Sequence, residues 1–143
     1  MKKYHISRHH RFIVVGLNFR KADAVLRGKF SLNADSVDGL LRQAFEEGID
    51  GMLVTSTCNR TEIYGFASTP QHLIRLLCHH TEGTEAAFQA VGYVYENQEA
   101  ISHLFRVGAG LESQILGDFE IISQLKGAFK RSRQHNLGNP FLE

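Results

Sequence analysis

The order of short apolar segments and longer amphipathic segments constrains the fold of this chain most. Residues 11–17 are rich in β-branched side chains and predict a short buried strand. Residues 51–57 predict a second strand, and residues 61–67 a third, which shows period-two alternation. Residues 91–95 predict a fourth strand. Residues 18–33 mix charged and apolar side chains and predict no element.

Helical spacing separates these strands. Gly48 is expected to end the first helix in the left-handed conformation, and Pro70 to begin the second helix after Thr69. The first helix carries an apolar face at i, i+3, i+4, i+7 and i+8, and the second an inward-facing set: Val37, Leu40, Leu41, Ala44 and Phe45, then Leu73, Leu76 and Leu77. The order of elements up to residue 95 is therefore β-α-β-β-α-β.

From Asn97 onward the pattern becomes helical. The expected faces of two helices are Ile101, Leu104, Phe105 and Gly108, then Phe119, Ile122, Leu125 and Phe129 flanked by Ile121 and Ala128. We therefore predict an α+β fold, a ferredoxin-like split βαβ unit with an antiparallel sheet and helices on one face, extended by C-terminal helices. Residues 1–143 are expected to form one domain.

Composition excludes several classes of protein. The net charge of +1 argues against a positive electrostatic field over the whole surface that would attract nucleic acid. No segment has the roughly 20 apolar residues that span a bilayer. The polar N-terminus lacks a signal-peptide core. With only two cysteines there is no disulfide framework, so a reducing cytoplasmic setting without membrane association is expected.

Cys58 lies between two predicted strands and is the candidate nucleophile. A thiol reacts as the thiolate, and an ordinary cysteine is only a few per cent ionised at neutral pH. If the segment is extended, Arg60 lies on the same side as the thiol and favours its ionisation. Thr57, Asn59 and Thr61 supply small hydrogen-bonding groups around it. The pattern favours a reactive thiol that attacks an acyl ester.

The competing interpretation is that Cys58 is a small buried hydrophobic residue, which is the usual fate of cysteine. Its polar neighbours argue against that, because burial would strand several hydrogen-bond donors. Cys78 is the contrast, since it lies in a leucine-rich helical segment and is predicted to be structural.

Two separated motifs resemble one enzyme family. The run Ser56-Thr-Cys-Asn-Arg-Thr-Glu-Ile-Tyr64 resembles the signature of glutamyl-tRNA reductases, and the run from His103 to Gly117 resembles their second conserved block. Val15-Gly-Leu-Asn18 also fits, so the resemblance covers nearly the whole chain. It implies an enzyme in which a cysteine thiolate takes glutamate from tRNA as a thioester. NADPH then reduces the thioester to glutamate-1-semialdehyde, the first step of tetrapyrrole synthesis.

By this resemblance Cys58 is the nucleophile and His103 positions the ester or moves a proton. Thr57, Asn59 and Arg60 would line the glutamyl site, with Arg60 reading the side-chain carboxylate. The remaining substrate-contacting positions would be Ser113, Asp118, Phe119, Glu120 and Gln124. The family's usual Gly-Glu-Pro-Gln is Gly-Asp-Phe-Glu at 117–120, and Phe19 stands where a histidine is frequent.

The resemblance also implies parts that this chain lacks. No glycine-rich dinucleotide fingerprint follows a predicted strand, so we expect a fragment without the NADPH-binding and dimerisation domains, unable to complete the reduction alone. The expected partners are glutamyl-tRNA, a second copy in the full-length homodimer, and the next enzyme of the pathway.

Alternatives remain open at this point. A thiol redox protein of similar fold would need a resolving cysteine or a peroxide pocket, and a non-catalytic aminoacyl-tRNA-binding module would work without Cys58. No metal site is expected, because His5, His9 and His10 lie in a polar terminal segment and the run 78–80 diverges around a helix. The basic residues between Lys126 and Arg133 are interpreted as a solvated helix end, with contact to tRNA phosphates as the alternative.

Overall fold

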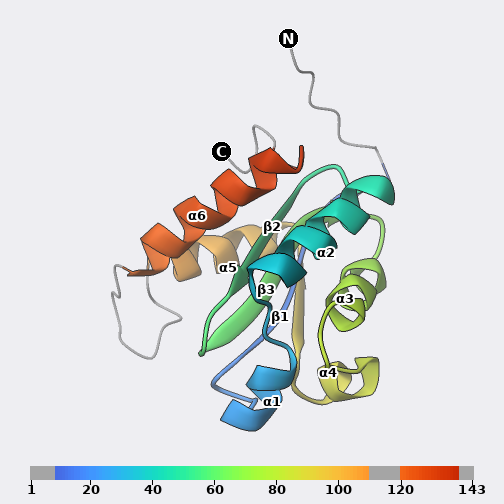
Figure 1. Ribbon diagram of the computed structural model, residues 1–143. Coiled ribbons are helices and arrows are strands. Elements are labelled where there is room, and N and C mark those ends of the chain that lie inside the picture. The colour runs from blue at the N-terminus through green and yellow to red at the C-terminus, as the bar shows by residue number, and fades with distance from the viewer. Residues whose placement is uncertain (1–8, 110–119, 139–143) are drawn as a thin grey trace.

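The computed structural model describes residues 9–109 and 120–138, with the side chains of all of these except 120–124. Their centre is a four-stranded sheet in the order β2-β3-β1-β4 (Figure 1). The strands are β1 (Arg11–Asn18), β2 (Met52–Ser56), β3 (Arg60–Ala67) and β4 (Tyr93–Glu96). Every pairing between them is antiparallel. An α+β fold is therefore confirmed.

The register of β1 against β3 divides the sheet into two faces. Val15 lies opposite Ile63, and Val14 lies opposite Tyr64. Because successive side chains of a strand point to opposite sides, Val15 and Ile63 share what we call the first face, and Val14 and Tyr64 share the second face. Two separate hydrophobic clusters follow this division.

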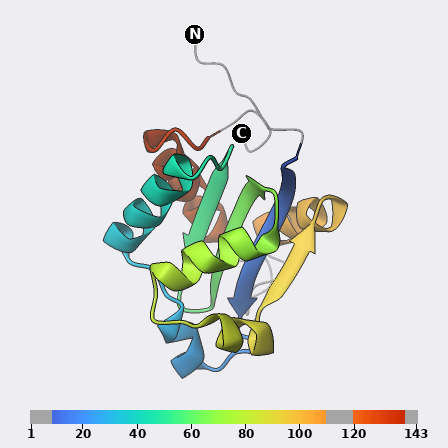
Figure 2. The same ribbon diagram turned by 90° about the vertical axis from the view of Figure 1, so that its right-hand side faces the viewer.

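Four helices lie on the first-face side of the sheet, with α1 at one end of the strands (Figures 1 and 2). They are α1 (Ala24–Lys29), α2 (Ala34–Glu46), α3 (Pro70–His79) and α4 (Glu85–Val91). The apolar residues predicted for α2 and α3 are buried in the first-face cluster, apart from Phe45, which is 51% exposed. Gly48 has φ +84° and ends α2 as predicted, since a left-handed backbone suits glycine.

Two helices cover the second face, α5 (Gln98–Gly108) and α6 (Glu120–Gln134). Ala100 is fully buried in the second-face cluster, and Leu104, Leu125 and Phe129 pack against the same cluster. Helices therefore lie on both faces, whereas the sequence predicted one. Phe105 was assigned to the inner side of α5, yet it is 73% exposed, and His103 and Val107 are buried instead.

Two short helices were not predicted. Asp23 caps α1 by accepting a hydrogen bond from the Leu26 N–H at 2.8 Å, and Thr84 caps α4 through the Ala87 N–H at 3.1 Å. Val91 was expected in a strand but ends α4. Each helix has only six or seven residues and is stabilised at its start by one capping side chain. A helix this short has no repeating apolar pattern, so periodicity did not reveal it. Within the described ranges, no helix is long and apolar enough to cross a membrane.

Candidate functional site

The turn between β2 and β3 carries the candidate nucleophile. The Thr57 N–H donates to the Arg60 carbonyl at 2.8 Å, which closes the turn. The Thr57 hydroxyl oxygen accepts from the N–H groups of Asn59 and Arg60, both at 3.2 Å. Cys58 lies at the tip and is exposed. The Thr57 side chain therefore shapes the loop that presents the thiol.

Arg27 fastens this turn to α1. Its Nε donates to the Cys58 carbonyl at 3.0 Å, and its Nη1 donates to the Ala22 carbonyl at 2.7 Å. A second link joins the same segments, because the Leu32 N–H donates to the Ser56 hydroxyl at 3.0 Å. Residues 22–32 thus form a wall beside the thiol.

A cavity of about 510 Å³ lies between this wall and the turn. We call it the thiol cavity, and its lining is mostly small or polar: Ala24, Arg27, Gly28, Ser31, Leu32, Ser56, Thr57, Cys58 and Asn59. Its volume lies within the roughly 300–1,000 Å³ typical of small-ligand sites. The exposed thiol therefore has room beside it for a ligand.

A buried cluster of polar side chains lies on the second face and centres on Glu62, which has no exposed surface. The carboxylate lies 2.5 Å from the His103 Nε2, accepts from the Tyr64 hydroxyl at 2.8 Å, and is 3.5 Å from the Arg60 guanidinium. The Tyr93 hydroxyl also donates to it. His103 is 2% exposed and packs against the Tyr93 ring with centroids 5.2 Å apart.

The electrostatics of this cluster follow from burial and pairing. Burial alone would raise the pKa of the Glu62 carboxyl, but the hydrogen bond from His103 and the charges of His103 and Arg60 hold that pKa below its ordinary value. Burial and the Glu62 charge raise the pKa of Tyr64 and of Tyr93. The carboxylate therefore stays ionised while both phenols stay protonated as its donors.

Gly16 makes room for this cluster. It pairs with Glu62 on one side of β1 and with Tyr93 on the other. A Cβ atom at this position would lie 2.7 Å from the Thr61 carbonyl oxygen and 2.8 Å from the Glu62 Cγ. The strand therefore needs glycine where the Tyr93 hydroxyl reaches across to Glu62.

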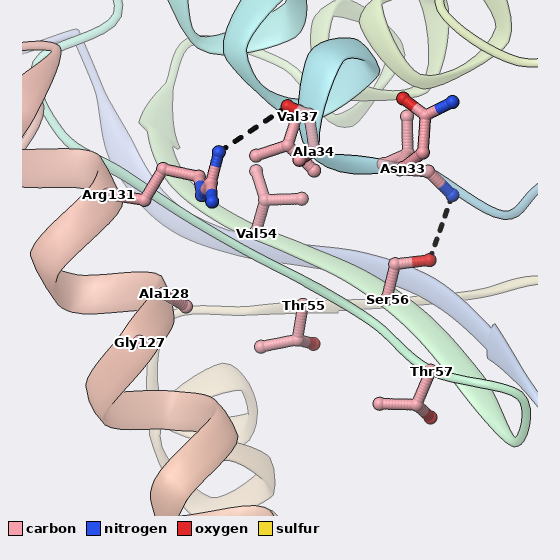
Figure 3. Close-up of a pocket in the computed structure, with 11 residues that line it drawn as sticks. Asn33, Ala34, Val37, Val54, Thr55, Ser56, Thr57, Gly127, Ala128 and Arg131 are labelled. Carbon is pink, nitrogen blue, oxygen red and sulfur yellow. Dashed lines mark hydrogen bonds between the residues drawn. The ribbon is translucent and has the colours of Figure 1, made fainter.

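A second cavity, of about 310 Å³, lies between the start of α2, the end of β2 and α6 (Figure 3). Arg131 of α6 donates to Asp38 of α2 at 2.9 Å, and its guanidinium lies 3.5 Å from the Ala34 carbonyl. Thr55 also lines the cavity and is 9% exposed, and its hydroxyl oxygen has no hydrogen-bond partner among the described residues. The cavity shares Leu32, Ser56 and Thr57 with the thiol cavity, so the two adjoin.

The structure divides the predicted site residues into three groups. Thr57, Cys58 and Asn59 line the thiol cavity. Arg60 and His103 both contact Glu62 on the second face. That the Arg60 guanidinium also lies near the Cys58 thiol stays a prediction. Ser113, Asp118 and Phe119 lie outside the described residues, and so do the side chains of Glu120 and Gln124, whose backbone belongs to α6.

Sequence reasoning missed Arg27 and Glu62. Glu62 had a signal, because it lies midway between Arg60 and Tyr64 in a strand, where period two places all three side chains on one face. A charge at such a position requires a buried partner. Arg27 had no comparable signal, since its bond to Cys58 joins residues 31 positions apart.

The remaining candidates from the sequence are the possible metal ligands, Cys78 and the basic residues of α6. In the part of the chain that the structure describes, no three metal-ligating side chains gather, and His5 lies outside it. Cys78 packs against the first-face cluster, and burial raises its pKa, as expected for a structural cysteine. Of the basic residues on α6, Lys126 and Lys130 are exposed.

Comparison with known proteins places this geometry in a family. Residues 15–143 match the family model for the glutamyl-tRNAGlu reductase N-terminal domain. Glutamyl-tRNA reductases of Christiangramia forsetii and Flavobacterium psychrophilum are 64% and 60% identical over 143 residues, which is 100% of this chain. The solved glutamyl-tRNA reductase from Methanopyrus kandleri has a TM-score of 0.75 and 27% identity, over 92% of this chain and 30% of that one.

The chain spans about a third of the curated relatives that it matches, namely 34% of the first and 35% of the second. The matching region is the N-terminal domain. The activity of a whole relative therefore does not transfer to this chain without a separate argument.

Proposed function

The chain belongs to the N-terminal domain family of glutamyl-tRNAGlu reductases, and from that premise we propose that Cys58 captures the glutamyl group of glutamyl-tRNA as a thioester. The observation that carries the proposal is an exposed thiol at the tip of a side-chain-braced turn, beside a cavity of about 510 Å³. Cys78 is instead partly buried and packs against the first-face cluster.

The capture step balances as a transesterification. The Cys58 thiol loses its proton to solvent, and the thiolate sulfur attacks the ester carbonyl carbon. A carbon–sulfur bond forms, and the bond from that carbon to the ribose oxygen breaks. The ribose oxygen keeps the electron pair and takes a proton from water, leaving the tRNA with a free hydroxyl group.

We assign recognition of the glutamyl group to the side of the turn that faces Glu62. Arg60 would hold the side-chain carboxylate, with Thr57 and Asn59 beside the thiol. His103 would position the ester or move a proton, held in place by Glu62. Further contacts are proposed from a separate set of positions: Ser113, Asp118, Phe119, Glu120 and Gln124.

The described residues of this chain form no dinucleotide site of the usual kind. NADPH sites of the usual kind need parallel strands joined by a glycine-rich turn. All strand pairings in the described residues are antiparallel. We therefore place the reduction of the thioester by NADPH, and the release of glutamate-1-semialdehyde for tetrapyrrole synthesis, in the longer protein.

The remaining inferences concern that longer protein and the fold class. We infer that residues 1–143 are its single catalytic N-terminal domain, that it forms a homodimer in the cytoplasm, and that it passes its product to the next pathway enzyme. We also infer a ferredoxin-like split βαβ unit. The strand order β2-β3-β1-β4, with α2 and α3 following β1 and β3, supports it.

The decisive experiment mixes the protein with glutamyl-tRNA labelled in glutamate, quenches in acid and measures protein-bound label. We expect label on the wild type and on Cys78→Ser, which is the matched control, and none on Cys58→Ser. Label on Cys58→Ser, or none on the wild type, contradicts covalent capture. A module that only binds aminoacyl-tRNA would hold equal amounts of tRNA with either cysteine replaced and would carry no acid-stable label.

A further inference from the structure

We propose that the thiol cavity is the subsite for the leaving group, the terminal nucleotide of the glutamyl-tRNA whose ribose carries the ester. The inference rests on the proposed capture by Cys58. It assigns a ligand to the wall formed by residues 22–32, which the recognition of glutamate does not use.

Cys58 lies between two different environments. Arg60 and Glu62 share the second face of β3, where His103 joins them. The Cys58 carbonyl and the thiol cavity lie toward Arg27 of α1, whose neighbour Leu26 packs on the first-face cluster. The turn therefore has an acid-recognising side and an open side.

The geometry of an ester under attack separates its two halves. The acyl chain and the alcohol oxygen leave the carbonyl carbon in diverging directions, while the sulfur approaches across the carbonyl plane. If the glutamyl carboxylate reaches Arg60, the ribose extends away from it. The thiol cavity, which Cys58 lines, is the space that we assign to the ribose.

The side chains that line the thiol cavity suit a nucleotide. Ser31, Ser56 and Asn59 are hydrogen-bonding side chains suited to ribose and base edges. Arg27 uses one N–H for the Cys58 carbonyl and one for the Ala22 carbonyl, and a guanidinium has five. Its remaining donors and its charge suit the phosphate that joins the terminal nucleotide to the rest of the RNA.

Gly28 offers a way to close this cavity without disturbing the fold. It lies in α1 and lines the cavity, and a Cβ atom there would meet nothing within 4 Å. Gly127 is the matched control, because it is also helical, also has nothing within 4 Å of such an atom, and lines the second cavity instead. A tyrosine at Gly28 adds its ring beside the thiol cavity, and a tyrosine at Gly127 adds its ring beside the second cavity.

The experiment measures acid-stable labelling of Cys58 by two labelled substrates, the glutamyl ester of adenosine and the ethyl ester of glutamate. Gly28→Tyr is expected to slow capture from the adenosine ester by about tenfold or more, equivalent to about 1.4 kcal/mol. Capture from the ethyl ester should stay at the wild-type rate, which also shows that the variant is folded. Gly127→Tyr should leave both rates unchanged.

If Gly28→Tyr captures glutamate from both esters at the wild-type rates, or is slowed equally with both, the leaving-group subsite is overturned while the proposed function stands. Failure of the wild type to take label from glutamyl-tRNA defeats the proposed function itself, whereas label from glutamyl-tRNA with none from the adenosine ester overturns the subsite alone. A measurement on the unaltered cavity gives a second test. Adenosine monophosphate should slow alkylation of Cys58 by iodoacetamide in a Cys78→Ser background, and an unchanged alkylation rate contradicts the subsite.

Discussion

The two faces of the sheet are built by different chemistry. The first face packs aliphatic and aromatic side chains from β1, β3 and four helices into one apolar cluster. The second face also has an apolar cluster, but beside it Glu62 gathers four polar partners with no exposed carboxylate surface. The apolar face holds the fold through area removed from water, whereas the polar cluster holds it through directed bonds.

This difference teaches how a single short strand serves both purposes. In β3, Ile63 points to the first face, where it is one apolar side chain among others. Glu62 and Tyr64 point to the second face, where each depends on a specific hydrogen-bond partner. Loss of one partner leaves the others buried without their hydrogen bond. Substitutions on the two faces should therefore differ in what they disturb, as well as in how much.

The largest expected effect comes from Glu62→Ala. It removes the acceptor shared by His103, Tyr93 and Tyr64, so the free energy of unfolding should fall by about 3–5 kcal/mol. Urea unfolding measures the loss. We expect capture of glutamate by Cys58 to fall as well, because His103 loses the carboxylate 2.5 Å away that fixes its ring. If Glu62→Ala captures glutamate at the full wild-type rate, the Glu62 cluster has no part in the reaction of Cys58.

Leu77→Ala tests the first face with a similar destabilisation. Leu77 is fully buried in the first-face cluster, so the substitution should cost about 2–5 kcal/mol of unfolding free energy. At temperatures where the variant stays folded, its rate of labelling at Cys58 should match the wild type. If labelling falls as far as in Glu62→Ala, general loss of stability explains both results and the comparison fails.

Gly16→Ala should have a smaller effect, confined to the second face. The added methyl group meets the Thr61 carbonyl at 2.7 Å and the Glu62 side chain at 2.8 Å, so about 1–3 kcal/mol of stability should be lost through overpacking. Gly65→Ala is the control on the first face, since its nearest contact is 3.3 Å. Calorimetric melting should show the larger decrease in Tm for Gly16→Ala.

The smallest expected effect is a pH dependence that belongs to the second face. The pKa of Glu62 is held below its ordinary value of 4.5 in the folded protein, so its contribution to stability is complete above that value. It is lost as the pH falls from 4.5 through the lower folded pKa, because the unfolded chain takes up the proton first. Asp38 and Glu47 also have lowered pKa values and act in the same direction.

Glu62→Gln isolates that contribution. Between pH 4.5 and the lowest pH at which both proteins fold, stability of this variant should fall less steeply than that of the wild type, as measured by urea titrations. Parallel slopes would assign the acid sensitivity to Asp38, Glu47 and other exposed carboxylates.

Much of this fold could be predicted from sequence because its patterns are local. The alternation in residues 61–67 and the helical spacing around Leu40 and Leu76 concern neighbours along the chain. Phe105 was misplaced because the spacing of apolar residues on α5 fits more than one inner face, and packing against the sheet chose the face with His103. The helices at residues 24–29 and 85–91 are too short to repeat a pattern.

The sequence by itself determined the strands, the main helices and Cys58 as the thiol between two strands, since each depends on residues a few positions apart. Only the tertiary structure decided that α5 and α6 cover the second face, that Glu62 binds a histidine 41 positions away, and that Arg27 anchors the Cys58 carbonyl. Such contacts depend on how strands pair and helices pack, and no local pattern of side chains encodes that geometry.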